Sequence, residues 1–88
     1  MNRTETAMTI QKAKEILSKI TSYLRNAAKE KSRQTSKFLK GLRKDIETQI
    51  NSLEQRLNKG RIERTDSKCK VFIDSTNYYK LDTLGVLK

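Results

Sequence analysis

Six basic residues recur at helical spacing in the middle of the chain. They are Arg25, Lys29, Arg33, Lys37, Lys40 and Lys44, separated by 4, 4, 4, 3 and 4 positions. Side chains three or four positions apart lie on the same face of a helix, so a helical segment here carries a row of cations. Such a row contacts the phosphates of a nucleic acid and releases the counterions condensed on them. The chemistry that this spacing indicates is the binding of a polyanion.

The excess positive charge is concentrated in the same segment. The 88 residues include 20 Lys and Arg against 10 Asp and Glu, a formal net charge of +10. Residues 25–44 hold eight cations, Arg43 among them, and one anion, Glu30, which amounts to +7. A charge run of this kind is usually a solvated surface that keeps a protein soluble. The clustering and the lack of compensating acids favour polyanion binding over that interpretation.

Lysine and aromatic residues indicate which polyanion is bound. Lysine outnumbers arginine 13 to 7, and lysine acts as a point charge, which suits phosphate contact better than base reading. Tyr78 and Tyr79 lie among cations near Phe72, and aromatic side chains in that setting stack on unpaired bases. The competing interpretation is that Phe72 or one tyrosine belongs to the core. This pattern favours RNA over DNA.

The residue combinations that enzymes use are missing from the sequence. The chain has no His and one Cys, which excludes Ser-His-Asp and Cys-His nucleophiles, imidazole zinc sites and an internal disulfide. Cys69 alternates with Val71 and Ile73, so we expect a buried, unreactive thiol. No glycine-rich phosphate loop or calcium loop is present. We therefore predict no catalytic residue, no metal site and no cofactor.

Two amphipathic helices are predicted to position the cations, over residues 2–28 and 37–59. Asn2 and Glu5 resemble a capping box at the start of the first helix, and Gly60 is a suitable stop for the second. Apolar residues recur in both segments at intervals of three and four, which is the helical period. They are Ala7, Ile10, Ala13, Leu17, Ile20, Leu24 and Ala28, then Leu39, Leu42, Ile46, Ile50, Leu53 and Leu57.

The polar segment 29–36 between these helices leaves two architectures open. It contains no Gly, Pro, Asn or Asp, which makes a turn unfavourable and allows one helix of about 75 Å. Such a helix needs a second copy and predicts a dimeric coiled coil. However, it would place Lys31 and Thr35 on the apolar face, and helices average about 12 residues. The second architecture is an antiparallel helical hairpin, in which the cations gather around the loop.

The last third of the chain changes to the period of a strand. Cys69, Val71 and Ile73 alternate with polar or outward positions, which indicates a strand. The polar residues 74–77 fit a turn, and residues 78–82 can return as a second strand. Residues 61–64 can add a short third strand, and a terminal helix from Asn77 is the alternative to the hairpin.

These elements predict a mainly α protein with a small β element (α+β). The whole chain, 1–88, is expected to be one small domain, with 1–60 helical and 61–88 forming a β-hairpin or meander. The one cysteine fits a reducing cytoplasm. No apolar run approaches the 18 residues of a membrane span. A homodimer is compatible with either helical architecture and is required by the continuous helix.

Two functions from different classes fit this sequence. The first is a small nucleic-acid-binding protein, with RNA favoured over DNA, that contacts the phosphate backbone. The second is a small regulator or inhibitor, of the phage or plasmid type, that binds an acidic surface of a host protein such as a nuclease or toxin, alone or together with RNA. The predicted binding residues are Arg25, Lys29, Arg33, Lys37, Lys40, Arg43, Lys44, Tyr78 and Tyr79.

Overall fold

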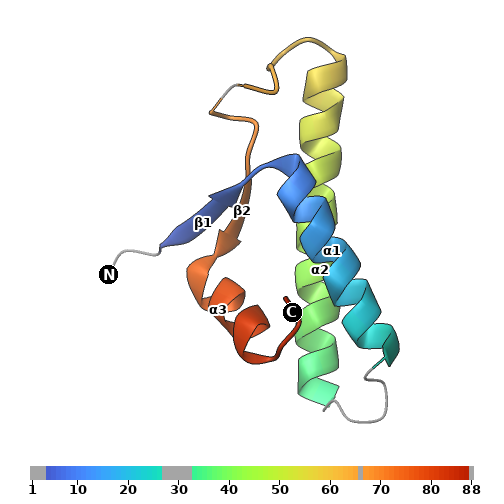
Figure 1. Ribbon diagram of the computed structural model, residues 1–88. Coiled ribbons are helices and arrows are strands. Elements are labelled where there is room, and N and C mark those ends of the chain that lie inside the picture. Colours follow the sequence, from blue (N-terminus) through green and yellow to red (C-terminus); the bar gives the residue numbers. More distant parts are fainter. Residues whose placement is uncertain (1–3, 27–32, 66, 88) are drawn as a thin grey trace.

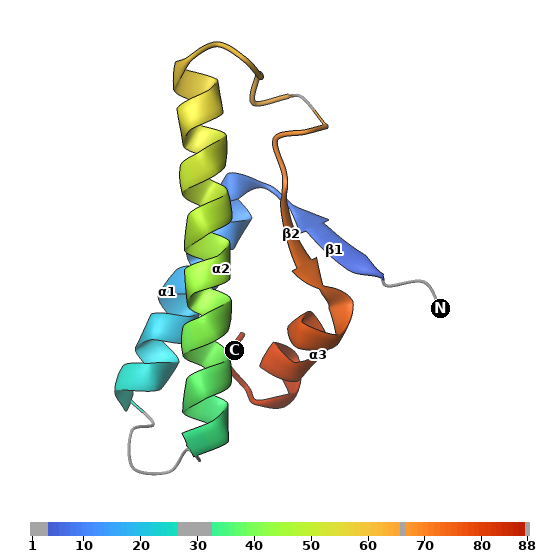
Figure 2. The ribbon, with the colours of Figure 1, turned by 180° about the vertical axis from the view of Figure 1, so that it is seen from behind.

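Two amphipathic helices fold back on each other and pack against a small sheet and a third helix. The computed structural model describes residues 4–26, 33–65 and 67–87. Its elements are β1 (Glu5–Met8), α1 (Ile10–Asn26), α2 (Arg33–Asn58), β2 (Val71–Asp74) and α3 (Ser75–Thr83). Figure 1 shows the hairpin of α1 and α2, and Figure 2 shows α2 passing in front of α1 with β2 and α3 on its other side. The predicted α+β class and helical hairpin are confirmed, and the continuous helix is excluded.

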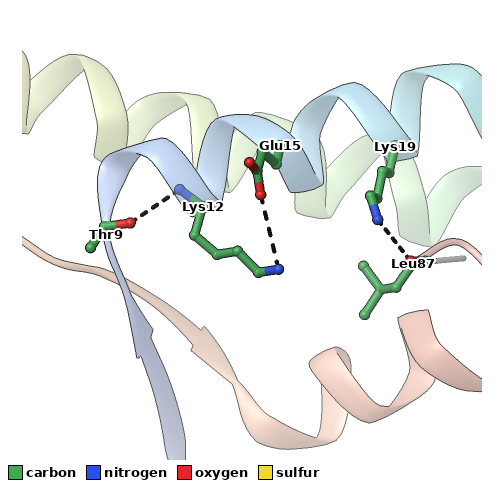
Figure 3. Close-up of polar contacts among 5 residues, drawn as sticks. All are labelled: Thr9, Lys12, Glu15, Lys19 and Leu87. Atoms are coloured by element: carbon green, nitrogen blue, oxygen red, sulfur yellow. Dashed lines mark hydrogen bonds and ion pairs between the residues drawn. The ribbon is translucent and has the colours of Figure 1, made fainter.

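The first helix begins at Ile10, eight positions later than predicted. Thr9 caps it, because the backbone N–H of Lys12 donates to Thr9 Oγ1 at 3.1 Å, as Figure 3 shows, and the N–H of Ala13 donates to Thr9 O at 3.0 Å. A threonine that accepts from the third helical N–H is a standard N-cap. The helix then buries the predicted positions Ile10, Ala13 and Ile20.

Residues 5–8 form strand β1, so the predicted capping box at Glu5 is wrong, as is the prediction that this part of the segment 1–60 is helical. Asn2 lies outside the described residues. Met8 is the buried residue of this segment, whereas Ala7, a member of the predicted helical apolar row, is exposed. One buried residue fits the helical period and the strand period equally well. The segment forms a strand because it pairs with β2.

The sheet consists of β1 and β2 in antiparallel register, with Glu5 opposite Asp74 and Met8 opposite Val71. Val71 and Ile73 are buried, as the alternation predicted. Their partner is the N-terminal strand, so the predicted C-terminal β-hairpin over 61–88 is corrected. The pairing of β1 with β2 continues one residue beyond the strands, where the N–H of Ser75 donates to Thr4 O at 2.9 Å.

Residues 74–77 start a helix where we predicted a turn. Asp74 accepts a hydrogen bond from the N–H of Thr76 at 2.9 Å and is the N-cap of α3. Clusters of Asp, Ser, Thr and Asn favour turns and helix starts for the same reason: their side chains bond to nearby backbone N–H groups. The segment 78–82 is therefore helical, as the alternative of a terminal helix predicts, although α3 begins two residues before Asn77. Residues 61–64 form no strand.

The core lies between the helical hairpin, the inner face of the sheet and α3. The buried side chains are those of Met8, Ile10, Ala13, Ile16, Ile20, Leu39, Leu42, Ile46, Ile50, Leu53, Cys69, Val71, Ile73, Leu81 and Val86. The predicted apolar face of α2 and the buried thiol of Cys69 are thus confirmed. Gly60, with φ of 72°, follows α2 as the expected stop. Lys19 Nζ donates to Leu87 O at 2.8 Å and ties the C-terminal segment to α1 (Figure 3).

A side chain of α2 closes the outer edge of β2. The N–H of Phe72 donates to Gln49 Oε1 at 2.9 Å, and Gln49 Nε2 donates to Phe72 O at 2.8 Å. The Gln49 amide thus takes the place of a third strand. Unpaired strand edges are prone to pair with other chains, so this contact both protects the edge and sets the distance between α2 and β2.

Gln49→Ala is expected to lower the free energy of unfolding by about 1–2 kcal/mol, because two backbone groups of Phe72 lose their partners. Urea titration followed by circular dichroism measures this change. Gln55→Ala is the matched control: Gln55 is exposed on the same helix and its loss should cost less than about 0.5 kcal/mol. Equal effects of the two substitutions would show that the Gln49 contact contributes nothing.

Candidate nucleic-acid interface

Four of the predicted cations form one exposed row along the first half of α2. Steps of four, three and four residues place them within about 60° of each other around the helix, at 100° per residue. The row extends over about 16 Å at 1.5 Å per residue. These residues, named the basic row below, are Arg33, Lys37, Lys40 and Lys44.

The basic row carries its positive charge without compensation from the described parts of the chain. The ion pairs found there join Lys12 to Glu15 at 4.0 Å and Lys14 to Glu54 at 3.1 Å, and neither includes a member of the row. Like charges at helical spacing repel by a few tenths of a kcal/mol per pair. A polyanion laid along the row removes that repulsion and releases its own counterions.

The other predicted cations occupy different positions. Arg25 is exposed in the last turn of α1, at the end of the hairpin where α2 begins (Figure 1), so it adds charge near the start of the basic row. Arg43 is only half-exposed and lies about 60° around the helix from Lys40 and about 100° from Lys44. Arg43 therefore lies at the edge of the row and is less accessible than the members of the row. Lys29 lies outside the described residues.

Both predicted tyrosines lie on α3, in different environments. Tyr79 is 71% exposed, whereas Tyr78 is half-buried and packs against the core. The Tyr79 ring is thus accessible to a base that could stack on it, whereas Tyr78 contributes mainly to packing against the core. Lys80 Nζ lies 4.5 Å from the centroid of the Phe38 ring, a cation–π contact. This contact joins α3 to the half of α2 that carries the basic row.

A groove that the sequence did not predict lies between the second half of α2 and the segment that leads into β2. Its volume is about 350 Å³. The polar and aromatic side chains that line it include Thr48, Ser52, Arg56, Lys68, Lys70 and Phe72. Lys68, Lys70 and Phe72 alternate with buried residues along the sequence, and this pattern indicates one wall of the groove. No local pattern links that wall to Arg56, which only tertiary packing brings to it.

Comparison of the chain with protein-family models, curated proteins and solved structures found no match. Among the described residues, no three His, Cys, Asp or Glu side chains are grouped so that they could hold a metal ion. The helices built from those residues are also too short or too polar to cross a membrane. The functional argument therefore rests on the basic row and the groove.

Proposed function

We propose that this protein is a small nucleic-acid-binding protein that holds a phosphate backbone along the basic row. The observation that carries the proposal is four exposed cations at steps of four, three and four residues, with no carboxylate partner among the described residues. Charge of one sign on one helix ridge is the electrostatic footprint of a nucleic-acid-binding surface. Arg25 extends this footprint at the end of the hairpin.

The proposed mode of action is binding of the strand, without catalysis. Three members of the basic row are lysines, which contact phosphates as point charges and carry little sequence information. RNA is favoured over DNA because exposed aromatic rings, Tyr79 and Phe72, suit the unpaired bases that RNA-binding proteins commonly hold. The protein would act by sequestering or positioning such a strand.

The test is a salt series of binding measurements by fluorescence anisotropy, with a labelled single-stranded RNA and a labelled DNA duplex. Four phosphate contacts predict that log K falls with log salt at a slope of about −3 for the single strand and about −4 for the duplex. Binding of both probes that is independent of salt would contradict the proposal, as would no binding at about 0.1 M salt.

A pull-down with and without nuclease treatment separates this function from the regulator class. Material captured through RNA should disappear after digestion. A protein partner that remains bound after digestion would instead favour a regulator that binds an acidic protein surface.

A further inference from the structure

We propose that the groove between α2 and β2 binds an unpaired base of a single-stranded nucleic acid, stacked on Phe72, and that Arg56 and Lys70 hold the adjoining phosphate. This inference rests on the proposed function, because the strand must first be held along the basic row. It adds a second, base-binding site that phosphate contacts alone do not require.

The Phe72 ring is exposed because of the fold. Its neighbours Val71 and Ile73 point into the core, and alternation along a strand therefore directs Phe72 to the outer face of the sheet. The side chain remains 42% exposed there. A base stacked on the ring removes this apolar surface from water, and aromatic platforms of this kind hold single strands with little preference among bases.

The backbone beneath the ring is held in place by Gln49. Both the N–H and the carbonyl of Phe72 bond to the Gln49 side-chain amide, at 2.9 and 2.8 Å. A fixed platform loses less conformational entropy when a ligand binds. The same bonds occupy the amide of Gln49, so it is not free to read the edge of a base. The site is therefore built for stacking.

The remaining lining of the groove suits a phosphate and a base. Arg56 and Lys70 supply positive charge, Thr48 and Ser52 supply hydroxyl groups, and none of the described lining residues is acidic. The volume of about 350 Å³ is within the range of pockets that hold small ligands, about 300–1,000 Å³. A nucleotide matches this combination of apolar, cationic and hydroxyl groups.

A continuous polar line on α2 joins the basic row to the groove. Lys44 ends the row, and Thr48, Ser52 and Arg56 follow it at successive steps of four residues. Each such step advances about 6 Å and rotates about 40° around the helix. Thr48 Oγ1 donates to Lys44 O at 2.9 Å, within this line. A strand lying along the row can thus follow α2 into the groove.

The first experiment uses Phe72→Trp as a reporter, because the chain contains no other Trp. The probes are a short oligouridylate and linear polyphosphate, which has phosphates but no bases. We expect oligouridylate to quench the Trp fluorescence by stacking, and polyphosphate to bind without quenching. Equal quenching by the two probes would overturn the inference, as would oligouridylate binding without quenching.

The second experiment compares affinities. Phe72→Leu should weaken oligouridylate binding at least about fivefold, the lower end for loss of one stacked base, and change polyphosphate binding less than about twofold. Phe72→Tyr keeps an aromatic ring and should retain the affinity. If the leucine variant does not fold, a loss of affinity in the tyrosine variant would still contradict the inference. A loss that follows Tyr79→Leu instead would place the stacking on α3 and overturn the inference.

The charge of the groove is tested with Arg56→Gln and the matched control Arg61→Gln. Arg61 is exposed and lies outside the groove lining, so both variants lose one charge but only the first should lose oligouridylate affinity. Equal losses would overturn the role of Arg56. If the wild-type protein binds neither probe, the proposed function itself fails. If it binds both and the Phe72 variants behave as wild type, only the groove inference fails.

Discussion

Replacing all four residues of the basic row by glutamine is expected to lower the affinity for single-stranded RNA about a thousandfold at 0.1 M salt. Each phosphate contact with a single strand releases about 0.7 counterion, which at this salt concentration contributes about 1 kcal/mol. Four lost contacts should also reduce the slope of log K against log salt by about 3. Fluorescence anisotropy across the salt series measures both quantities.

The fold should survive this quadruple substitution. The four side chains are exposed, and their removal relieves repulsion between like charges along one ridge. The urea midpoint of the variant should therefore equal or exceed that of the wild type. A variant that unfolds would show that the row has a structural role.

The matched control neutralises four cations that lie elsewhere on the surface. These are Lys12, Lys59, Arg61 and Arg64, all exposed. Both quadruple variants carry a net charge of +6, which is +10 minus 4. Charges beyond about 10 Å are screened at this ionic strength, so the control should lose less than about tenfold in affinity. An equal loss in both variants would mean that net charge, and not the basic row, drives binding.

The largest expected effect on stability is that of Ile46→Ala. Ile46 is 0% exposed in the middle of α2, and truncation of a buried isoleucine to alanine costs about 2–5 kcal/mol. A chain of this length is expected to have a free energy of unfolding of about 4–13 kcal/mol. The substitution should therefore remove a large part of the stability and shift the urea midpoint far downward.

Ile46→Val is the graded control for that substitution. It removes one methylene group and should cost about 0.5–1.5 kcal/mol. Circular dichroism at increasing urea concentrations compares the two variants directly. If the alanine and valine variants unfolded at the same urea concentration, Ile46 could not be packed as the structure shows.

The two amphipathic helices and the basic row could be predicted from local spacing. The intervals of Leu39, Leu42 and Ile46 define the buried face of α2, and the intervals of Lys37, Lys40 and Lys44 define an exposed face. Both follow from the helical period alone. The choice between hairpin and continuous helix was not local, because the segment 29–36 carries neither a turn signal nor an apolar residue.

The small sheet could not be predicted in the same way. Strand β1 has four residues and one buried side chain, Met8, too few to reveal a period of two. Its partner β2 lies more than sixty positions away, and the contact between Thr6 Oγ1 and Ser75 Oγ at 3.1 Å joins residues that no window of sequence relates. The polar residues 74–77 fit a turn and a helix cap equally well.

The basic residues of the segment 25–44 remain the centre of the proposed function, with two changes. By itself, the sequence determined that Lys37, Lys40 and Lys44 share a helix face, because helical geometry is a local property of consecutive residues. Only the tertiary structure decided that packing half-covers Arg43 and that Arg56 meets Phe72 across a groove. Contacts of that kind depend on how whole elements pack, and packing is determined by side chains distributed over the entire chain.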